Sequence, residues 1–188
     1  MRRVCVYCGS NFGTDPAFRE AAALVGRELA AHKLGLVYGG GSVGLMGTVA
    51  DAVLAAGEEV VGVIPKKLVQ LEKEHRGLTK LIEVDTMHER KRLMMEHADG
   101  FLVLPGGYGT LEELFEVVAW LQLGFHHKPV GLLNVGGFYD LLLGQLDHMA
   151  AHGLLKGEHR AMLLVDTDVG ELLKKMKAFQ PHDAGKWL

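Results

Sequence analysis

Short, almost continuously apolar runs alternate along the chain with longer stretches in which apolar residues recur every three or four positions. Apolar runs bounded by glycine or proline are typical of strands buried on both faces, whereas spacing by three or four is typical of helices. Seven strands are expected, at 3–7, 35–39, 59–65, 81–85, 100–105, 129–135 and 162–166. Six helices are expected between and after them, near 16–32, 45–56, 88–98, 111–123, 138–152 and 169–179.

The order of these segments predicts the architecture. Strands that alternate with helices are typical of βαβ units, which build an open parallel sheet. We therefore expect an α/β, Rossmann-like fold of about seven strands, flanked by helices on both faces and formed by residues 1–188 as one domain. The charged segment 65–80 has no clear pattern, and a flap, a short helix or a partner surface is expected there.

Three glycine-rich segments directly follow expected strands: CGSNFG at 8–13, GGGSVGLMG at 39–47 and PGGYGT at 105–110. Because the carboxyl ends of parallel strands meet at one edge of a sheet, we expect the three turns to lie together. Glycine lets backbone N–H groups approach an anion, and the helix that follows adds its N-terminal dipole. A phosphorylated small molecule is the favoured ligand, and the alternative is that glycine only permits tight turns.

Two common nucleotide-binding motifs do not account for these turns. The segment 39–44 matches G-x-G-x-x-G, but it follows the second strand, and the next strand ends in IPK without a carboxylate for an NAD ribose. The P-loop pattern G-x-x-x-x-G-K-[ST] does not occur in the sequence. An NAD-dependent oxidoreductase and a P-loop NTPase are therefore both disfavoured.

Three carboxylates follow the third glycine turn. Thr110 and Glu113 have capping-box spacing, so Glu113 has a structural explanation as part of a helix start. Glu113 also lies beside the expected anion site, and capping does not exclude a catalytic role. Glu112 lies about 100° around the helix from Glu113, and Glu116 returns to the side of both. One or two of the three are expected to reach a ligand, and this spacing alone does not support a glycosidase-like acid/base pair.

A second helix start carries two adjacent cations. In TMHERKR, Thr86 and Glu89 have capping-box spacing, and Arg90 and Lys91 follow within the first turns. Cations at a helix N-terminus oppose the helix dipole, which is easier to explain if an anion binds there. Arginine also offers a planar fork for phosphate or ribose oxygens. The alternative is a solvated basic face, which is common on helices.

Charge and composition narrow the class of partner. The 188-residue chain has a net charge of −3, which gives no support for nucleic-acid binding. No apolar run approaches the roughly 20 residues that cross a bilayer, so no membrane partner is expected, and the expected location is cytoplasmic. Cys5 and Cys8 form C-x-x-C, but strand positions three apart face opposite sides, and no second C-x-x-C completes a zinc site. We interpret both cysteines as buried apolar residues, and we expect no metal site.

The motifs together resemble one family. PGGYGTLEE, at 105–113, matches the signature P-G-G-x-G-T-x-x-E of the LOG ("lonely guy") proteins, which are cytokinin riboside 5′-monophosphate phosphoribohydrolases. VYCGS, GGGSVGLMG, MHERK and KPVGLLNVGGFYD are similar to other blocks of the family, in the same order. The resemblance covers nearly the whole chain. It implies a Rossmann-like homodimer with active sites near the subunit interface, and it implies no metal and no organic cofactor.

The resemblance also implies an activity. The reaction is hydrolysis of the N-glycosidic bond of N6-substituted AMP, or of AMP itself, which releases the free base and ribose 5-phosphate. By motif, Arg90 and Glu113 would be the catalytic pair, while Glu72 is a weaker match because its surroundings are less motif-like. The implied substrate-binding residues are Glu72, Arg90, Lys91, Gly107, Tyr108, Gly109, Thr110, Leu111, Glu112 and Glu113, with Ser10, Gly40 and Gly41 from the other glycine turns.

A mechanism fits both the residues and the resemblance. Glu113 would stabilise the positive charge that builds on the ribose and orient the attacking water, while Arg90 would orient the nucleotide. Members of the family have also been called lysine decarboxylases, but no lysine here stands out as a Schiff-base partner for pyridoxal phosphate. Two other classes stay open: a nucleotide- or phosphorylated-cofactor-binding carrier without turnover, and a nucleosidase for other nucleoside 5′-monophosphates.

Overall fold

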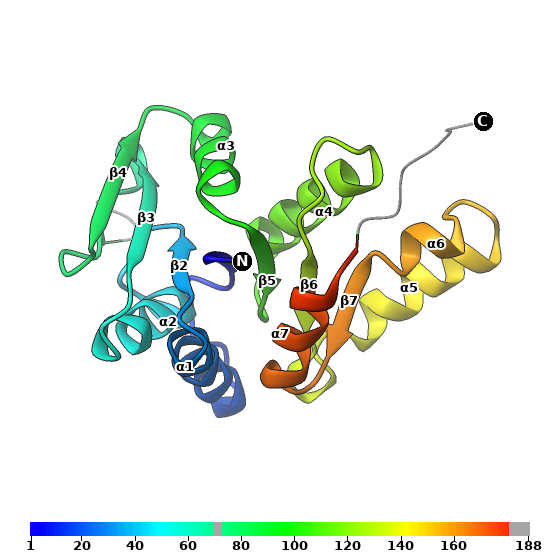
Figure 1. The fold of residues 1–188 in the computed structure, drawn as a ribbon, viewed down its shortest axis with the longest axis horizontal. Coiled ribbons are helices and arrows are strands. Elements are labelled where there is room, and N and C mark those ends of the chain that lie inside the picture. Colours follow the sequence, from blue (N-terminus) through cyan, green and yellow to red (C-terminus); the bar gives the residue numbers. More distant parts are fainter. Residues whose placement is uncertain (70–72, 181–188) are drawn as a thin grey trace.

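The structure, a computed structural model, describes residues 1–69 and 73–180. Within these ranges, seven parallel strands form one sheet in the order β4-β3-β2-β1-β5-β6-β7 (Figure 1). The strands are β1 (Arg3–Tyr7), β2 (Gly35–Tyr38), β3 (Val60–Pro65), β4 (Lys80–Val84), β5 (Gly100–Val103), β6 (Val130–Leu133) and β7 (Leu163–Asp166). Every expected strand is present, and the Rossmann-like α/β fold is confirmed.

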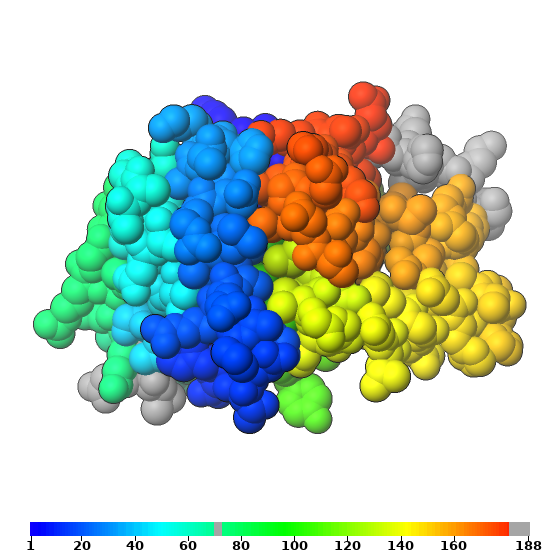
Figure 2. All heavy atoms as spheres, turned by 90° about the horizontal axis from the view of Figure 1, so that it is seen from below, coloured from blue at the N-terminus to red at the C-terminus, as the bar shows by residue number. Residues whose placement is uncertain are grey.

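Helices cover both faces of the sheet, as expected. The helices are α1 (Pro16–Ala31), α2 (Gly44–Ala55), α3 (Met87–His97), α4 (Tyr108–Gln122), α5 (Asp140–Ala151), α6 (Gly157–Arg160) and α7 (Val169–Ala178). One core cluster joins α1, α2 and α7 to the sheet, and the other joins α3, α4 and α5 to the opposite face. The first and last of these helices, α1 and α7, lie side by side although they are far apart in the sequence (Figure 2).

The central strand β1 divides its side chains between the two cores. Val4 and Val6 belong to the cluster under α1 and α2, while Cys5 and Tyr7 belong to the cluster under α3 and α4. Cys8 lies on the side opposite to Cys5, and both thiols are buried and free, as the sequence predicted. In the described ranges no three His, Cys, Asp or Glu side chains gather as metal ligands.

The strand order places a switch point beside β1. From β1 the chain proceeds outward through β2, β3 and β4, and then crosses to the other side of β1 to form β5, β6 and β7. In open parallel sheets such a reversal opens a crevice at the carboxyl ends of the two central strands. Here these strands are β1 and β5, and two of the three glycine turns follow them directly.

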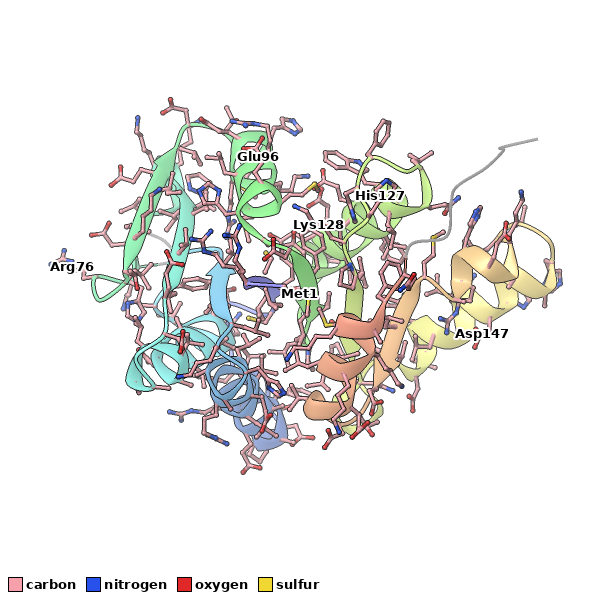
Figure 3. All side chains as sticks on the ribbon, in the orientation of Figure 1. Met1, Arg76, Glu96, His127, Lys128 and Asp147 are labelled. Carbon is pink, nitrogen blue, oxygen red and sulfur yellow. The ribbon has the colours of Figure 1, made fainter. Side chains whose placement is uncertain are left out.

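Charged side chains project from the outer faces. Glu96 on α3, Arg76 before β4 and Asp147 on α5 all point away from the sheet (Figure 3). Among the described helices, none combines the length and the apolar character needed to cross a membrane.

Two helix starts test the capping-box predictions. α3 has Thr86 as its N-cap, and the Thr86 hydroxyl accepts a hydrogen bond from the Glu89 N–H at 3.1 Å, which confirms this half of the capping box. The Glu89 carboxylate accepts from the Asp85 N–H at 3.2 Å, one residue before the position that the box predicts. α4 starts three residues earlier than expected, because its N-cap is Gly107. Thr110 therefore lies inside the first turn, where its side chain is buried, and the prediction of a capping box formed by Thr110 and Glu113 is wrong.

The segment before β4 is largely irregular. It begins with a 3₁₀ turn, η1 (Lys66–Leu68), which agrees with the short helix that was one of three expectations. Further on, Glu74 forms an isolated antiparallel bridge with Gly41, and the Ser42 hydroxyl donates a hydrogen bond to the Lys73 carbonyl at 2.6 Å. The second glycine turn therefore anchors this segment to the sheet. A second 3₁₀ turn, η2 (Val135–Gly137), follows β6.

Candidate active site

The three glycine turns are joined by backbone hydrogen bonds. The Gly9 N–H donates to the Pro105 carbonyl at 3.0 Å, and the Leu45 N–H donates to the Gly9 carbonyl at 3.2 Å. Gly44 has a φ of +66°, and a Cβ at this position would lie 2.2 Å from the Ser10 carbonyl oxygen. Glycine thus permits the close approach of the first and second turns. The prediction that the turns meet at one sheet edge is confirmed.

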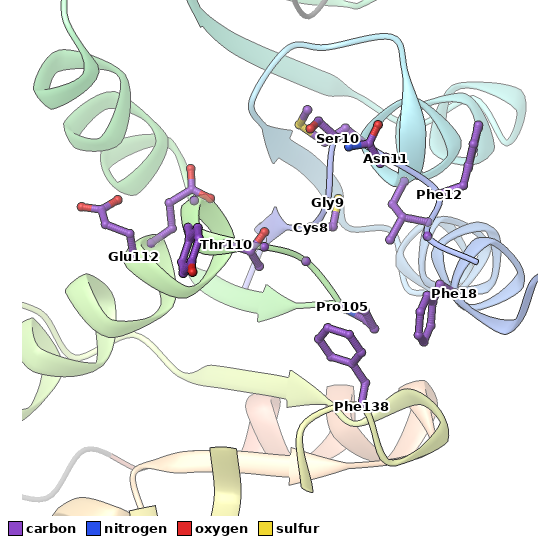
Figure 4. A pocket seen from close by; sticks show the side chains of 18 of the residues that line it. Cys8, Gly9, Ser10, Asn11, Phe12, Phe18, Pro105, Thr110, Glu112 and Phe138 are labelled. Carbon is purple, nitrogen blue, oxygen red and sulfur yellow. The ribbon is translucent and has the colours of Figure 1, made fainter. Parts of the chain in front are cut away.

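A pocket of about 420 Å³ opens where the turns meet. This volume falls in the range of roughly 300–1,000 Å³ that is typical of small-molecule sites. Thr110 and Glu112 lie on one side of the pocket and Phe18 and Phe138 on the other, with Gly9 between them (Figure 4). One wall is therefore polar and charged, and the opposite wall is aromatic.

The N-terminus of α4 forms part of the polar wall. The first helical hydrogen bond of α4 runs from the Leu111 N–H to the Gly107 carbonyl at 3.0 Å. The N–H groups of the residues before Leu111 therefore have no acceptor within the helix, as at any helix start. A Cβ at Gly107 or Gly109 would meet no atom within 4 Å, so the backbone is open to the pocket. Such a helix start is suited to bind a phosphate group.

Arg90 reaches the pocket from the first turn of α3. Only 6% of the residue is exposed, although it lines the pocket. Its Nη2 donates a hydrogen bond to the Gly39 carbonyl oxygen at 3.2 Å. A Cβ at position 39 would lie only 2.0 Å from Nη2, so the guanidinium needs a glycine there. The second glycine turn therefore fixes the direction of Arg90 from a different element.

Glu113 lines the same pocket from α4 and is half-buried. Its negative charge acts on the two cysteines in β1 and in the turn that follows it. Burial, and next the negative charge of Glu113, raise the pKa of the Cys8 thiol above its ordinary value. The same two causes raise the pKa of Cys5, which the positive charge of Arg90 lowers in part. A cation from α3 and a carboxylate from α4 thus line one cavity, together with the uncharged thiol of Cys8.

Lys91 lies between α3 and α4. Its Nζ is 2.5 Å from Glu112 Oε1 and 2.9 Å from Glu116 Oε1. Burial alone would lower the pKa of Lys91, but the hydrogen bonds from Lys91 to the two carboxylates outweigh it and raise the pKa above its ordinary value. Lys91 is therefore a charged group held within an ion-pair cluster.

Most residues with a predicted role in substrate binding gather in this pocket. Glu72 lies outside the described residues. Four others do not line the pocket: Lys91 and Leu111, which lie behind its charged wall, and Gly40 and Gly41, which are buried and bond to the segment at 74–75. Those that do line it are Ser10, Arg90, Gly107, Tyr108, Gly109, Thr110, Glu112 and Glu113.

The aromatic wall was not anticipated from the sequence. Phe12 and Phe18 come from the β1–α1 region, and Phe138 comes from the turn after β6. Phe18 and Phe138 pack edge to face, with ring centroids 5.3 Å apart. Met87, at the start of α3, also lines the pocket. In the sequence, these aromatic residues are marked only by their position within or beside the turns that carry the other site residues.

The fold and the site together define a Rossmann-type α/β protein with a glycine-lined pocket at its switch point. A family model described as "Possible lysine decarboxylase" matches residues 46–176. Two cytokinin riboside 5′-monophosphate phosphoribohydrolases of Arabidopsis thaliana are 47% and 46% identical to the chain. These matches span 98% and 96% of this chain and 81% and 84% of the relatives. The chain belongs to the LOG family of cytokinin riboside 5′-monophosphate phosphoribohydrolases.

Solved structures of lower identity share the fold. The molybdenum cofactor binding protein from Rippkaea orientalis matches with a TM-score of 0.70 at 20% identity, over 95% of this chain and 97% of that chain. The molybdenum cofactor carrier protein from Chlamydomonas reinhardtii matches with a TM-score of 0.68 at 21% identity, over 94% of this chain and 98% of that chain. At these identities the likeness extends to the architecture alone.

The decarboxylase description does not fit the pocket. Decarboxylation with pyridoxal phosphate needs a lysine that forms a Schiff base with the cofactor. Among the described residues that line the pocket there is no lysine. Lys91, the buried lysine directly after Arg90, forms ion pairs with Glu112 and Glu116 and does not line the pocket.

Proposed function

We propose that this pocket hydrolyses the N-glycosidic bond of adenosine 5′-monophosphates, with N6-substituted (cytokinin) nucleotides as the main substrates and AMP as a further one. Water adds to the ribose C1′, the bond from C1′ to the base breaks, and the base leaves with a proton. The products are the free base and ribose 5-phosphate. The names and the 46–47% identity of the plant relatives support this substrate class.

One observation carries the proposal: a buried arginine and a carboxylate line the same pocket as the open N-terminus of α4. The first-turn N–H groups of α4 bind the 5′-phosphate, and this remote contact supplies binding energy for orientation at the scissile bond. Glu113 stabilises the positive charge that develops on the ribose and directs the water to C1′. Arg90, held by the Gly39 carbonyl, orients the nucleotide against Glu113.

A nucleotide panel tests the reaction. The purified protein is incubated with AMP, N6-isopentenyl-AMP, GMP, CMP and UMP, and the released base is measured by chromatography. We expect the free base from N6-isopentenyl-AMP and a slower release from AMP. Release from all five at similar rates would indicate a general nucleotide nucleosidase. Tight nucleotide binding without any released base would indicate a carrier.

Substitution of Glu113 tests the assignment of the carboxylate. Glu113→Gln keeps the shape of the side chain but loses its charge, so we expect base release to fall at least about 100-fold. We expect Arg90→Ala to abolish base release as well. Because Glu113 does not belong to a capping box, the thermal midpoint of Glu113→Gln should stay within about 2 °C of the wild-type value. Near-normal turnover combined with a lowered midpoint would assign Glu113 a purely structural role.

The quaternary structure and the location belong to the same proposal. An apolar stripe runs along α4 and past its end, formed by Tyr108, Phe115, Leu123 and Phe125, which are 95%, 41%, 40% and 72% exposed. Tyr108 lines the pocket and Phe115, seven positions later, lies on the same side of the helix, so this exposed apolar surface beside the pocket supports a homodimer with active sites near the interface. The reaction needs no membrane and no nucleic acid, and a cytoplasmic location agrees with a small, diffusible nucleotide substrate.

A further inference from the structure

Lys91 is buried next to the pocket without lining it. Only 8% of the residue is exposed, and its ammonium group is held by Glu112 and Glu116. The preceding residue, Arg90, does line the pocket. The two consecutive cations of α3 therefore serve different surfaces. The resemblance to the LOG family implied that Lys91 holds the nucleotide, whereas its contacts point to a different role.

The cluster around Lys91 balances the charge of α4. Glu112, Glu113 and Glu116 fall within five consecutive positions, and the first two line a pocket suited to a negatively charged phosphate. Carboxylates four residues apart on a helix repel each other. Lys91 places one positive charge between Glu112 and Glu116, and the low exposure of its side chain limits screening by solvent.

We propose that Lys91 is a positioning residue for the hydrolysis, which braces α4 against α3 and balances the charge beside Glu113 without touching the nucleotide. This inference rests on the proposed function. Lys91 follows Arg90 on α3, and Glu112 precedes Glu113 on α4. The ion pair therefore joins the two helices at the level of the catalytic pair, and it sets the separation across which Arg90 and Glu113 act.

Loss of the lysine charge would act on Glu113 through its surroundings. Without Lys91, the negative charges of Glu112 and Glu116 are unbalanced, which raises the pKa of Glu113. Since Glu113 acts as a carboxylate, the acid limb of the pH–rate profile moves to higher pH. The Tyr7 phenol and the Cys5 and Cys8 thiols stay protonated because burial raises their pKa values. Arg90 from α3 and Glu112 from α4 share the pocket with Glu113, and the charge of Glu113 acts on Cys5, Tyr7 and Cys8 from β1 and its turn. Lys91 from α3 and Glu116 from α4 form the neighbouring ion-pair cluster with Glu112.

The test is the pH dependence of N6-isopentenyl-AMP hydrolysis by Lys91→Met, which keeps most of the side-chain length and removes the charge. We expect kcat to fall at least tenfold, KM to change less than twofold, and the acid limb to move to higher pH. Inorganic phosphate, measured as a competitive inhibitor and by calorimetry, should bind as tightly as to the wild type. Arg92→Met is the matched control, because it removes an exposed ion pair with Glu96 on the same helix.

A rescue variant separates charge balance from substrate contact. In Lys91→Met/Glu116→Gln one carboxylate is neutralised together with the lysine, so the cluster has the same net charge as in the wild type and the pocket residue Glu112 is kept. We therefore expect the acid limb and most of kcat to return. This variant also decides the question if Lys91→Met alone does not fold. The proposal is overturned if Lys91→Met binds phosphate more weakly and the double variant does not restore the binding, since Lys91 would then be a direct ligand.

Two further outcomes are informative. A Lys91→Met protein with wild-type kcat and a wild-type pH profile would also overturn the proposal. If the wild-type protein releases no base, the proposed function fails by itself. Phosphate binding to Lys91→Met, measured by calorimetry, then still tells the two roles apart, because only a direct ligand would weaken it.

Discussion

At the scale of single residues, the site depends on glycines whose neighbours are distant in sequence. The Gly39 carbonyl accepts a hydrogen bond from the Arg90 guanidinium, and a side chain at Gly39 or Gly44 would collide with Arg90 or with the Ser10 carbonyl, respectively. Sequence reasoning identified these turns because glycine clusters after strands are a local signal. It assigned Gly40 and Gly41 to substrate binding, whereas the structure buries both away from the pocket and against the segment before β4. Only the tertiary fold decides which glycine of a cluster faces the ligand.

Gly39→Ala is expected to impair catalysis by displacing Arg90. The added Cβ would lie 2.0 Å from Arg90 Nη2, and the guanidinium would have to move. Since a displacement of about 1 Å can cost on the order of 100-fold in rate, we expect kcat/KM for N6-isopentenyl-AMP to fall at least tenfold. Gly144→Ala, on the exposed side of α5 with no atom within 4 Å of the added Cβ, is the control. Equal activity of the two variants would contradict this account of Arg90.

At the scale of elements, periodicity located all seven strands and the long helices, while helix ends were less predictable. α4 begins at Tyr108 because Gly107 is its N-cap, although glycines at 107 and 109 are typical of a loop. Glycine has a low helix propensity, but it leaves the backbone N–H groups exposed, as an anion site at a helix start requires. The four-residue α6 was missed because a single turn has no periodicity.

The end of α4 is joined to β6 by a buried histidine. His126 Nε2–H donates to the Val117 carbonyl at 2.8 Å, and its Nδ1 accepts from the Lys128 N–H at 3.1 Å, which requires a neutral ring. Burial lowers the pKa of His126 below its ordinary value of 6.5, the hydrogen bond to Val117 offsets this only in part, and the positive charges of Lys128 and His127 add to the lowering. Lys128 and His127 lie in this connection (Figure 3).

This lowered pKa predicts a loss of stability in mild acid. As the pH falls below about 6.5, the unfolded state takes up a proton that the folded state resists, so the free energy of unfolding decreases. The stabilisation is fully present above pH 6.5 and is lost as the pH falls towards the pKa of the folded protein. Urea unfolding at a series of pH values between 7.5 and 5 measures it. The dependence should be weaker in His126→Gln and unchanged in His88→Gln, whose side chain is exposed and distant in sequence from His126.

At the scale of the whole molecule, the strand order determines where chemistry can occur. The reversal beside β1 brings residues from positions 8–13, 39–47, 87–90 and 105–113 to one edge of the sheet. The alternation of strands and helices was enough to predict that edge. It could not predict the aromatic wall, because Phe18 and Phe138 are far apart in sequence and resemble ordinary core residues until the sheet is assembled.

The apolar stripe on α4 predicts a dimer that one charge can disrupt. Phe115 lies within the stripe, and a carboxylate there would be buried without a partner in the dimer, which is unfavourable by several kcal/mol. We expect the wild-type protein to sediment as a dimer. For Phe115→Glu we expect a dimer dissociation constant at least tenfold higher than that of the wild type. Leu154→Glu, at a position that is 81% exposed outside the stripe, should remain dimeric. A dimer that withstands Phe115→Glu would place the interface on another surface.

The hydrogen bonds that join the glycine turns also have a kinetic consequence. Because Gly9 is hydrogen-bonded to Pro105 and Leu45 to Gly9, the backbone that we propose to bind the phosphate is already ordered before a ligand arrives. Little conformational entropy is then lost when the phosphate is bound. Association should accordingly be a single step whose observed rate rises linearly with phosphate concentration, without the plateau that a slow closing of the site would produce.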